Sequence, residues 1–420
     1  SGTAKAGLNV GLTPCRFTYF CVKEPTVRLL IWGAGGVGKT SLACHLAKLA
    51  MERDSKKRLC AKHLMLPVLI EPELIEQEIG VEGIKEPLVE AVRKRLQDLV
   101  NEQEPIPDQL LHYLLKRGRV LVIIDRFSEM RDPIRKTVVP NSKTNPFNAL
   151  IVTSRTRETP EKTTMDWLEP LQLKGSELVR FMEDYLKSQN KKEESLLEAA
   201  SQLEKIVDNR PITAFLAKLY IDQLITVGNR SVQLPKTIPD LMISCLERLN
   251  TEIAHQSDVV EVYLDNNTVC QDAKTVAWEC LRYTYRPNSA KREVLLASLA
   301  GDDPVSRLNY LEKSLRIVET VGEEQSRVRF TLDPLAEYLA GLYLIEQYKN
   351  NLTLWQDFLK TADTFTPEAI QGFILAIQDC CFARSAQTQI PESIVRELRQ
   401  RTALVNTFGI EPKSSQQITV

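Results

Sequence analysis

Eight consecutive residues near the start of the chain have the types and the spacing that a phosphate-binding loop requires. They are Gly33, Ala34, Gly35, Gly36, Val37, Gly38, Lys39 and Thr40, and Ser41 follows them. In this G-x-x-x-x-G-K-[ST] pattern the glycines let backbone N–H groups point at phosphate oxygens, while the lysine neutralises the β- and γ-phosphates. The threonine hydroxyl is a magnesium ligand. We therefore predict that these residues bind ATP or ADP with Mg²⁺.

Three further polar residues lie at or just after the ends of apolar runs. Asp125 is the expected second holder of magnesium, acting through water. Glu129 is the candidate for orienting water on the γ-phosphate, and Arg155 for contacting that phosphate. The alternatives for these two are a solvated glutamate at a helix start and an ordinary surface arginine. Lys39, Glu129 and Arg155 are thus the candidate catalytic residues, with Thr40 and Asp125 as metal-binding residues.

These residues need a scaffold, and the chain up to about residue 173 alternates short β-rich runs with helical stretches. The predicted strands are 28–32, 64–70, 120–124, 149–153 and 168–173, and the predicted helices are 39–53, 84–100 and 107–117. Several of the runs are apolar almost throughout, as strands covered on both faces by helices require. We therefore predict an α/β P-loop NTPase fold with a parallel, doubly wound sheet.

Helical periodicity replaces the strand pattern after this point. Helices are expected at 176–188, 194–207, 212–226, 239–250, 270–283, 291–300, 304–313 and 334–348, with a β-hairpin formed by 315–321 and 327–332. The amphipathic helices of 352–401 either begin a repeat array or cap the preceding domain. The predicted parts are an N-terminal extension or linker (1–24), a P-loop nucleotide-binding domain (25–173), a small helical domain (174–230), a winged-helix-like domain (231–348), a C-terminal helical segment (349–411) and a polar tail (412–420).

Four segments together resemble the NACHT class of STAND NTPases. They are the P-loop, Val-Ile-Ile-Asp-Arg-Phe-Ser-Glu at 122–129, Thr-Ser-Arg at 153–155, and Arg-Phe-Thr-Leu-Asp-Pro-Leu-Ala-Glu-Tyr-Leu-Ala at 329–340. The resemblance spans roughly residues 25 to 348. Asp125 and Glu129 match the first and last acids of the family's D-x-x-D-E cluster, whereas Ser128 occupies its middle place. Arg126 stands where many other P-loop ATPases carry glutamate.

The resemblance implies two further contacts with the nucleotide. Asn209-Arg210-Pro211 is similar to the family's G-x-P, in which proline meets adenine, so Pro211 is expected to line the adenine site. Family winged-helix domains often carry a histidine that holds the β-phosphate of ADP. Leu332 occupies that position here, which departs from the family's pattern.

Composition bears on the class of partner. The formal net charge of -1 supplies no global positive field, so nucleic acid is not favoured. The apolar runs are shorter than the roughly 18 residues of a membrane span, and a cytoplasmic protein without membrane contact is predicted.

The nine cysteines have no C-x-x-C pair and are expected to be buried thiols. The four histidines lack metal-ligand spacing, and none is assigned to a metal.

The resemblance and the site residues together imply a signal-transduction ATPase that hydrolyses ATP slowly. We expect a conformational switch that self-associates when ATP is bound, with an unidentified sensed ligand and effector partner, in defence or regulation. Two alternatives stay open. One is an AAA+-like ATPase acting on nucleic acid, which Arg126 and the near-neutral charge disfavour. The other is a scaffold whose nucleotide is structural.

Overall fold

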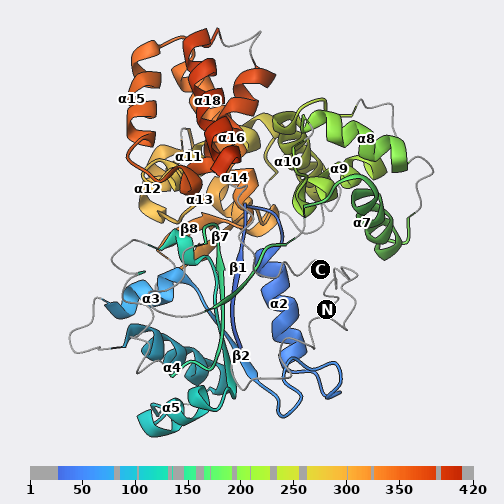
Figure 1. Ribbon diagram of the computed structural model, residues 1–420. Coiled ribbons are helices and arrows are strands. Elements are labelled where there is room, and N and C mark those ends of the chain that lie inside the picture. The colour runs from blue at the N-terminus through green and yellow to red at the C-terminus, as the bar shows by residue number, and fades with distance from the viewer. Residues whose placement is uncertain are drawn as a thin grey trace. The chain divides into compact units, whose positions relative to one another are not determined.

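The protein is described by a computed structural model (Figure 1). It describes residues 27–79, 86–101, 104–130, 135, 146–157, 165–170, 172–191, 196–208, 210–227, 234–254, 263–299, 301–322, 326–384 and 389–408. The chain divides after Leu171 into two compact units. The first holds the P-loop and its sheet, and the second is largely helical.

A parallel five-stranded sheet forms the centre of the first unit. Its strands are β1 (Val27–Trp32), β2 (Leu66–Ile70), β3 (Val120–Ile124), β4 (Ala149–Ser154) and β5 (Asp166–Leu168), in the order β2-β3-β4-β1-β5. Each neighbouring pair is parallel. Every residue of β3 and β4 is buried, as strands with helices on both faces must be. Because β4 lies between β1 and β3, the carboxyl ends of these three strands are adjacent.

Helices cover both faces of this sheet. They are α2 (Lys39–Ala50), α3 (Pro72–Ile79), α4 (Pro87–Val100) and α5 (Asp108–Lys116). Leu46 of α2 packs with Ile31 and Ile151 on one face, whereas Val92 of α4 belongs to the cluster of Leu30 on the other. Figure 1 shows α2 on one side of the sheet and α4 and α5 on the opposite side. The predicted α/β fold with a doubly wound parallel sheet is confirmed.

Two predictions for this unit were incomplete. The last strand was expected at 168–173, but β5 ends at Leu168, and Pro170 has no backbone N–H with which to continue a ladder. Leu173 instead forms an isolated antiparallel bridge with Ile212 in the second unit. Helix α3 was not predicted, because eight residues directly after a strand give little periodicity to detect.

The second unit is built from helices around one continuous apolar cluster. They are α7 (Gly175–Ser188), α8 (Leu196–Ile206), α9 (Ala214–Val227), α10 (Ile238–Ala254), α11 (Asn266–Leu281), α12 (Arg292–Ser298), α13 (Pro304–Asn309), the single turn η2 (Tyr310–Ser314), α14 (Asp333–Tyr348), α15 (Leu352–Ala362), α16 (Pro367–Ala383) and α18 (Glu392–Phe408). Within the described part of the chain, no helix is both long and apolar enough to cross a membrane.

A small antiparallel sheet interrupts these helices. The predicted hairpin is confirmed as β7 (Val318–Val321) and β8 (Arg327–Phe330), and its residues 323–325 lie outside the described residues. A short strand, β6 (Ala290–Lys291), pairs with β8, although Lys291 was expected to begin a helix. The Arg292 N–H donates to Ser326 O at 2.8 Å, so α12 starts directly at the sheet.

A polar cluster inside the second unit joins three segments that are distant in sequence. The Arg210 guanidinium donates to both carboxylate oxygens of Asp379 on α16, at 3.0 and 2.9 Å. The Tyr338 hydroxyl of α14 donates to the same carboxylate at 2.6 Å. Burial and the charge of Asp379 raise the pKa of Tyr338 well above its usual value, which keeps the hydroxyl protonated. The cluster therefore ties α14 and α16 to the residue that precedes Pro211.

Candidate functional site

The P-loop connects β1 to α2 and takes a conformation that depends on glycine. Gly36 and Gly38 have φ of 76° and 95°, a region that residues with a Cβ rarely adopt. The Lys39 ammonium donates to the carbonyl oxygens of Gly33 and Ala34, each at 2.8 Å. The lysine therefore lies across its own loop, so its charge is already held at the place where phosphate is expected.

Backbone hydrogen bonds fix this loop against its neighbours. Gly33 N–H donates to Ser154 O at the end of β4, at 3.1 Å. On the other side, Asp125 N–H donates to Ile70 O at the end of β2, at 3.1 Å. The carboxyl ends of β1, β4, β3 and β2 are thus linked, which is where ligands bind in open parallel sheets.

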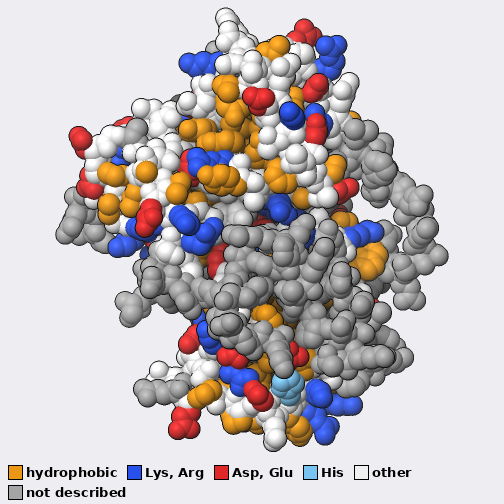
Figure 2. All heavy atoms as spheres, turned by 90° about the vertical axis from the view of Figure 1, so that its left-hand side faces the viewer, with side chains coloured by type: hydrophobic (Ala, Val, Ile, Leu, Met, Phe, Trp, Pro, Cys, Tyr) orange, Lys and Arg blue, Asp and Glu red, His pale blue; other side chains and the backbone are white. Residues whose placement is uncertain are grey.

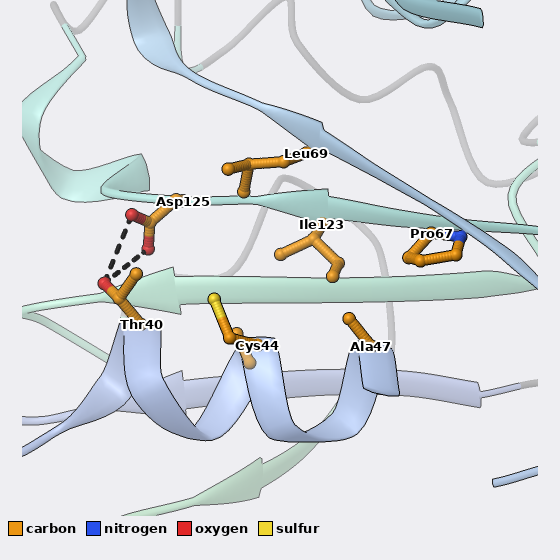
Figure 3. A pocket seen from close by; sticks show the side chains of 8 residues that line it. Thr40, Cys44, Ala47, Pro67, Leu69, Ile123 and Asp125 are labelled. Carbon is orange, nitrogen blue, oxygen red and sulfur yellow. Dashed lines mark hydrogen bonds between the residues drawn. The ribbon is translucent and has the colours of Figure 1, made fainter. Parts of the chain in front are cut away.

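Thr40 and Asp125 meet as the sequence predicts. The Thr40 hydroxyl donates to the two carboxylate oxygens of Asp125, at 3.0 and 3.2 Å (Figure 3). Asp125 is 5% exposed, although it is a carboxylate. A hydroxyl and a carboxylate are hard oxygen donors of the kind that Mg²⁺ prefers, so these two residues fit a magnesium ion shared with phosphate. The sequence predicted that both residues hold magnesium; it did not predict their direct hydrogen bond.

The other two candidate catalytic residues also lie together. Arg155 Nε is 3.7 Å from Glu129 Oε1, and each side chain is 7% exposed. Glu129 ends a short 3-10 turn, η1 (Phe127–Glu129), which begins two residues after Asp125. The Arg155 N–H donates to Ser128 Oγ at 2.9 Å, which holds the strand end against this turn. Both side chains are thus more buried than a solvated glutamate or an ordinary surface arginine would be.

Two residues at this site were missed by sequence reasoning. Thr153 donates to Asp125 and accepts a hydrogen bond from Arg126 N–H. Its only signal was its place two residues before Arg155 in the Thr-Ser-Arg triplet. Cys44 lies one helical turn after Thr40 on α2 and is exposed, contrary to the expectation of buried cysteines. Nothing in the sequence marked it.

Cys44 lines a cavity of about 190 Å³ that is also lined by Asp125. The lining side chains are Thr40, Ala43, Cys44, Ala47, Pro67, Leu69, Ile123 and Asp125 (Figure 3). Partial burial of the thiol in this cavity, and to a lesser degree the charge of Asp125, raise the pKa of the Cys44 thiol above its usual value. The thiol is therefore neutral near pH 7, which does not favour a nucleophilic role. Cys380 and Cys381 are buried free thiols, as expected.

The contacts implied by resemblance lie in the second unit. Pro211 follows Arg210 of the polar cluster and precedes Ile212, whose carbonyl accepts a hydrogen bond from Leu173 N–H at 3.0 Å. Asn209 lies outside the described residues. Leu332, which replaces the family's histidine, is exposed at the start of α14. The nucleotide contacts of Pro211 remain a prediction.

Charges of both signs are mixed among the described residues on one face of the protein. In the face that Figure 2 shows, the described Lys and Arg side chains lie among Asp and Glu side chains. Among the residues that the structure describes, no group of three His, Cys, Asp or Glu side chains is placed to hold a metal ion.

Comparison with known families identifies the last helices. Residues 363–406, which include α16 and most of α18, match the family NACHT C-terminal Helical domain 4. This segment lies beyond the part of the chain whose motifs resemble the NACHT class. No curated protein matches the chain.

Several solved structures have a loose likeness to the chain. A Walker-type ATPase of Pyrococcus abyssi has 12% identity and a TM-score of 0.32, covering 78% of this chain and 93% of its own. A STAND protein with a tetratricopeptide repeat sensor from Pyrococcus horikoshii has 14% identity and a TM-score of 0.33, covering 90% of this chain and 51% of its own. The Aeropyrum pernix ORC1 protein in complex with DNA has 13% identity and a TM-score of 0.32, covering 75% and 85%. Because these scores are low, no residue role is transferred from them.

The resemblance to the NACHT class therefore has two separate sources in the chain. In the first unit, the P-loop lysine contacts its own loop, Thr40 contacts Asp125, and Arg155 lies beside Glu129. The second ends in the helices that match the NACHT model. The predicted resemblance is confirmed, and the chain is consistent with a P-loop ATPase of the NACHT type within the STAND class.

Proposed function

We propose that this protein is an ATP- and ADP-dependent switch that hydrolyses ATP slowly and changes its conformation and self-association with the bound nucleotide. The observation that carries the proposal is the buried pair of Arg155 and Glu129, whose side chains lie 3.7 Å apart. The group expected to contact the γ-phosphate therefore contacts the group expected to orient the hydrolytic water. Binding and loss of that phosphate both act on one ion pair.

The P-loop residues supply the binding energy in this mechanism. Backbone N–H groups of residues 33–40 and the start of α2 face the phosphates, and Lys39 exchanges its contacts with Gly33 and Ala34 for phosphate oxygens. Magnesium, held by Thr40 and through water by Asp125, neutralises negative charge on the phosphates. These contacts are the same for ATP and ADP except at the γ-phosphate, so by themselves they give the two nucleotides similar affinities.

Arg155 and Glu129 supply the discrimination. A γ-phosphate attracts the Arg155 guanidinium, because a bidentate contact with phosphate is stronger than a 3.7 Å contact with a carboxylate. Glu129 then loses its contact with Arg155, and its carboxylate accepts a hydrogen bond from water, which it orients towards the phosphate. Both side chains are nearly buried, and water has little access before this exchange. Slow hydrolysis follows from that burial.

The second unit supplies the response in this proposal. Pro211 lines the adenine site, and the helices and hairpin of 231–348 form a winged-helix-like domain that moves with nucleotide state. The ATP-bound form self-associates in the cytoplasm and passes a signal from an unidentified ligand to an unidentified effector, in defence or regulation. The domain boundaries predicted from the sequence are part of the same proposal.

The test is to identify the nucleotide in the purified protein, and then to measure turnover and particle size. We expect adenine nucleotide to be present, turnover to be slow, and light scattering to report larger particles with ATP than with ADP. Turnover strongly stimulated by DNA would instead support an ATPase acting on nucleic acid. Tightly bound ADP with no turnover and one particle size would support a structural nucleotide.

A further inference from the structure

Thr153 contacts both the carboxylate of Asp125 and the backbone N–H of the next residue, Arg126. It belongs to β4, and only 1% of its surface is exposed. Its hydroxyl donates a hydrogen bond to Asp125 Oδ1 and accepts one from Arg126 N–H at 2.9 Å. A threonine hydroxyl has one hydrogen to donate, so this donor is fully used on the carboxylate. The side chain thus binds the same loop at two neighbouring points.

The first contact fixes the orientation of the carboxylate. The terminal torsion of an aspartate is broad, so the direction of its oxygens depends on their partners. Thr153 donates to Oδ1 from the β4 side, and in this orientation Thr40 Oγ1 lies 3.0 Å from Oδ1 and 3.2 Å from Oδ2. Oδ2 is also 3.9 Å from Arg126 Nε. Thr153 is β-branched, which restricts its own χ1 rotation. A stiff, buried side chain therefore orients the carboxylate.

The second contact stabilises an unusual backbone. Arg126 has φ of 58° and ψ of 36°, a left-handed conformation that is unfavourable for a residue other than glycine. The hydrogen bond from its N–H to Thr153 offsets part of this cost. This conformation begins the turn that carries Glu129. Loss of the hydroxyl would therefore disturb both the direction of Asp125 and the path of the next residues.

We propose that Thr153 is a positioning residue that sets the magnesium affinity of the nucleotide site by holding Asp125 towards Thr40. This inference rests on the proposed function, because it requires Asp125 to hold the metal. Residues that orient a metal-binding group change metal affinity by about 10- to 100-fold when they are lost. We expect loss of the Thr153 hydroxyl to lower the affinity for magnesium and to leave phosphate binding unchanged, because the P-loop holds the phosphates by itself.

The experiment compares Thr153→Val, which keeps the shape and removes the hydroxyl, with Thr153→Ser, which keeps the hydroxyl. Ser154→Ala is the matched control, because that neighbouring hydroxyl contacts Thr156 and not Asp125: it accepts a hydrogen bond from Thr156 N–H at 3.2 Å. ATP affinity is measured by calorimetry in EDTA and over a magnesium titration. Mn²⁺ binding in the presence of ADP is followed by electron paramagnetic resonance.

We expect Thr153→Val to require about tenfold more magnesium for the same ATP affinity and to weaken Mn²⁺ binding similarly. Its metal-free ATP affinity should equal that of the wild type, which also shows that the variant is folded. Thr153→Ser and Ser154→Ala should stay close to the wild type. Since the valine leaves the Arg126 N–H without its acceptor, Thr153→Ala provides a second variant, in which water can reach that group.

Two results would overturn the inference. The first is a wild-type magnesium requirement in Thr153→Val or Thr153→Ala. The second is an equal loss in Thr153→Ser, which would show that packing and not the hydroxyl matters. Asp125→Ala separates this inference from the proposed function: if that variant still binds ATP with full magnesium dependence, the assigned metal site itself is wrong. If it loses the dependence while Thr153→Val keeps it, only the positioning role fails.

Discussion

The Arg210 guanidinium forms two hydrogen bonds with the carboxylate of Asp379, a residue 169 positions further along the chain. The two side chains are 26% and 13% exposed, and Tyr338 donates a third hydrogen bond to the same carboxylate. Asp379 belongs to the segment that matches the NACHT C-terminal Helical domain 4. An ion pair thus links the matched helices to Arg210, the residue before Pro211.

Asp379→Asn should lower the free energy of unfolding of the second unit by roughly 2 kcal/mol, because it leaves a half-buried guanidinium without its counter-ion. Urea denaturation followed by circular dichroism measures this change. Asp363→Asn is the matched control, since it breaks the ion pair with Arg401 in the same helical segment but is largely exposed. That variant should change stability by less than about 0.5 kcal/mol. Equal effects of the two variants would contradict the special role of the Arg210 cluster.

Lys39→Ala should reduce ATP affinity at least about 100-fold, because the β- and γ-phosphates lose their charge partner in a site otherwise built from backbone dipoles. Isothermal titration calorimetry with MgATP measures the loss. Lys48→Ala, a substitution in the last turn of the same helix, should bind as the wild type does. Unchanged affinity in Lys39→Ala would refute the assignment of this loop to phosphate.

Glu129→Gln should bind ATP normally and leave it unhydrolysed, because the amide keeps the size of the side chain but not the charge that orients water. ATP-bound protein should then accumulate and form larger particles than the wild type. A single-turnover assay with labelled ATP, combined with light scattering, tests both statements. Turnover equal to that of the wild type would remove Glu129 from the mechanism.

Arg155→Ala should respond differently from Glu129→Gln. Without the guanidinium the protein has no contact that distinguishes ATP from ADP at the strand end, so its particle size should be the same with either nucleotide. Its affinity for ADP should stay close to that of the wild type, because the P-loop contacts are intact. An ATP-dependent increase in size in Arg155→Ala would show that another residue detects the γ-phosphate.

The Cys44 thiol should titrate at high pH. Its pKa is raised above the usual value by partial burial and, to a lesser degree, by the charge of Asp125, so the reactive thiolate is scarcer at pH 8 than for a free cysteine. The rate of alkylation of Cys44 by iodoacetamide, followed by peptide mass spectrometry, should therefore level off at a higher pH than that of a cysteine in a short unstructured peptide. Asp125→Asn removes a negative charge and should speed the reaction at pH 8. The same pH profile for Cys44 and for the peptide would contradict the raised pKa.

Local sequence patterns were sufficient for the parts of the site that are contiguous in the chain. The P-loop depends on glycines at positive φ and on a lysine that reaches back over its own loop, and all of these lie within residues 33–40. The predictions at 120–124 and 149–153 also agree with β3 and β4, because burial on both faces leaves a clear mark on composition. These features follow from neighbours in sequence, so the sequence by itself determined them.

Tertiary structure decided which side chains meet. No local pattern states that β4 inserts between β1 and β3, yet this order places Thr153 on Asp125 and Arg155 on Glu129. The pairing of Leu173 with Ile212 likewise depends on a partner far along the chain. Such contacts are selected by the packing of whole elements, whose free energy is shared among many residues and leaves no signature at any single position.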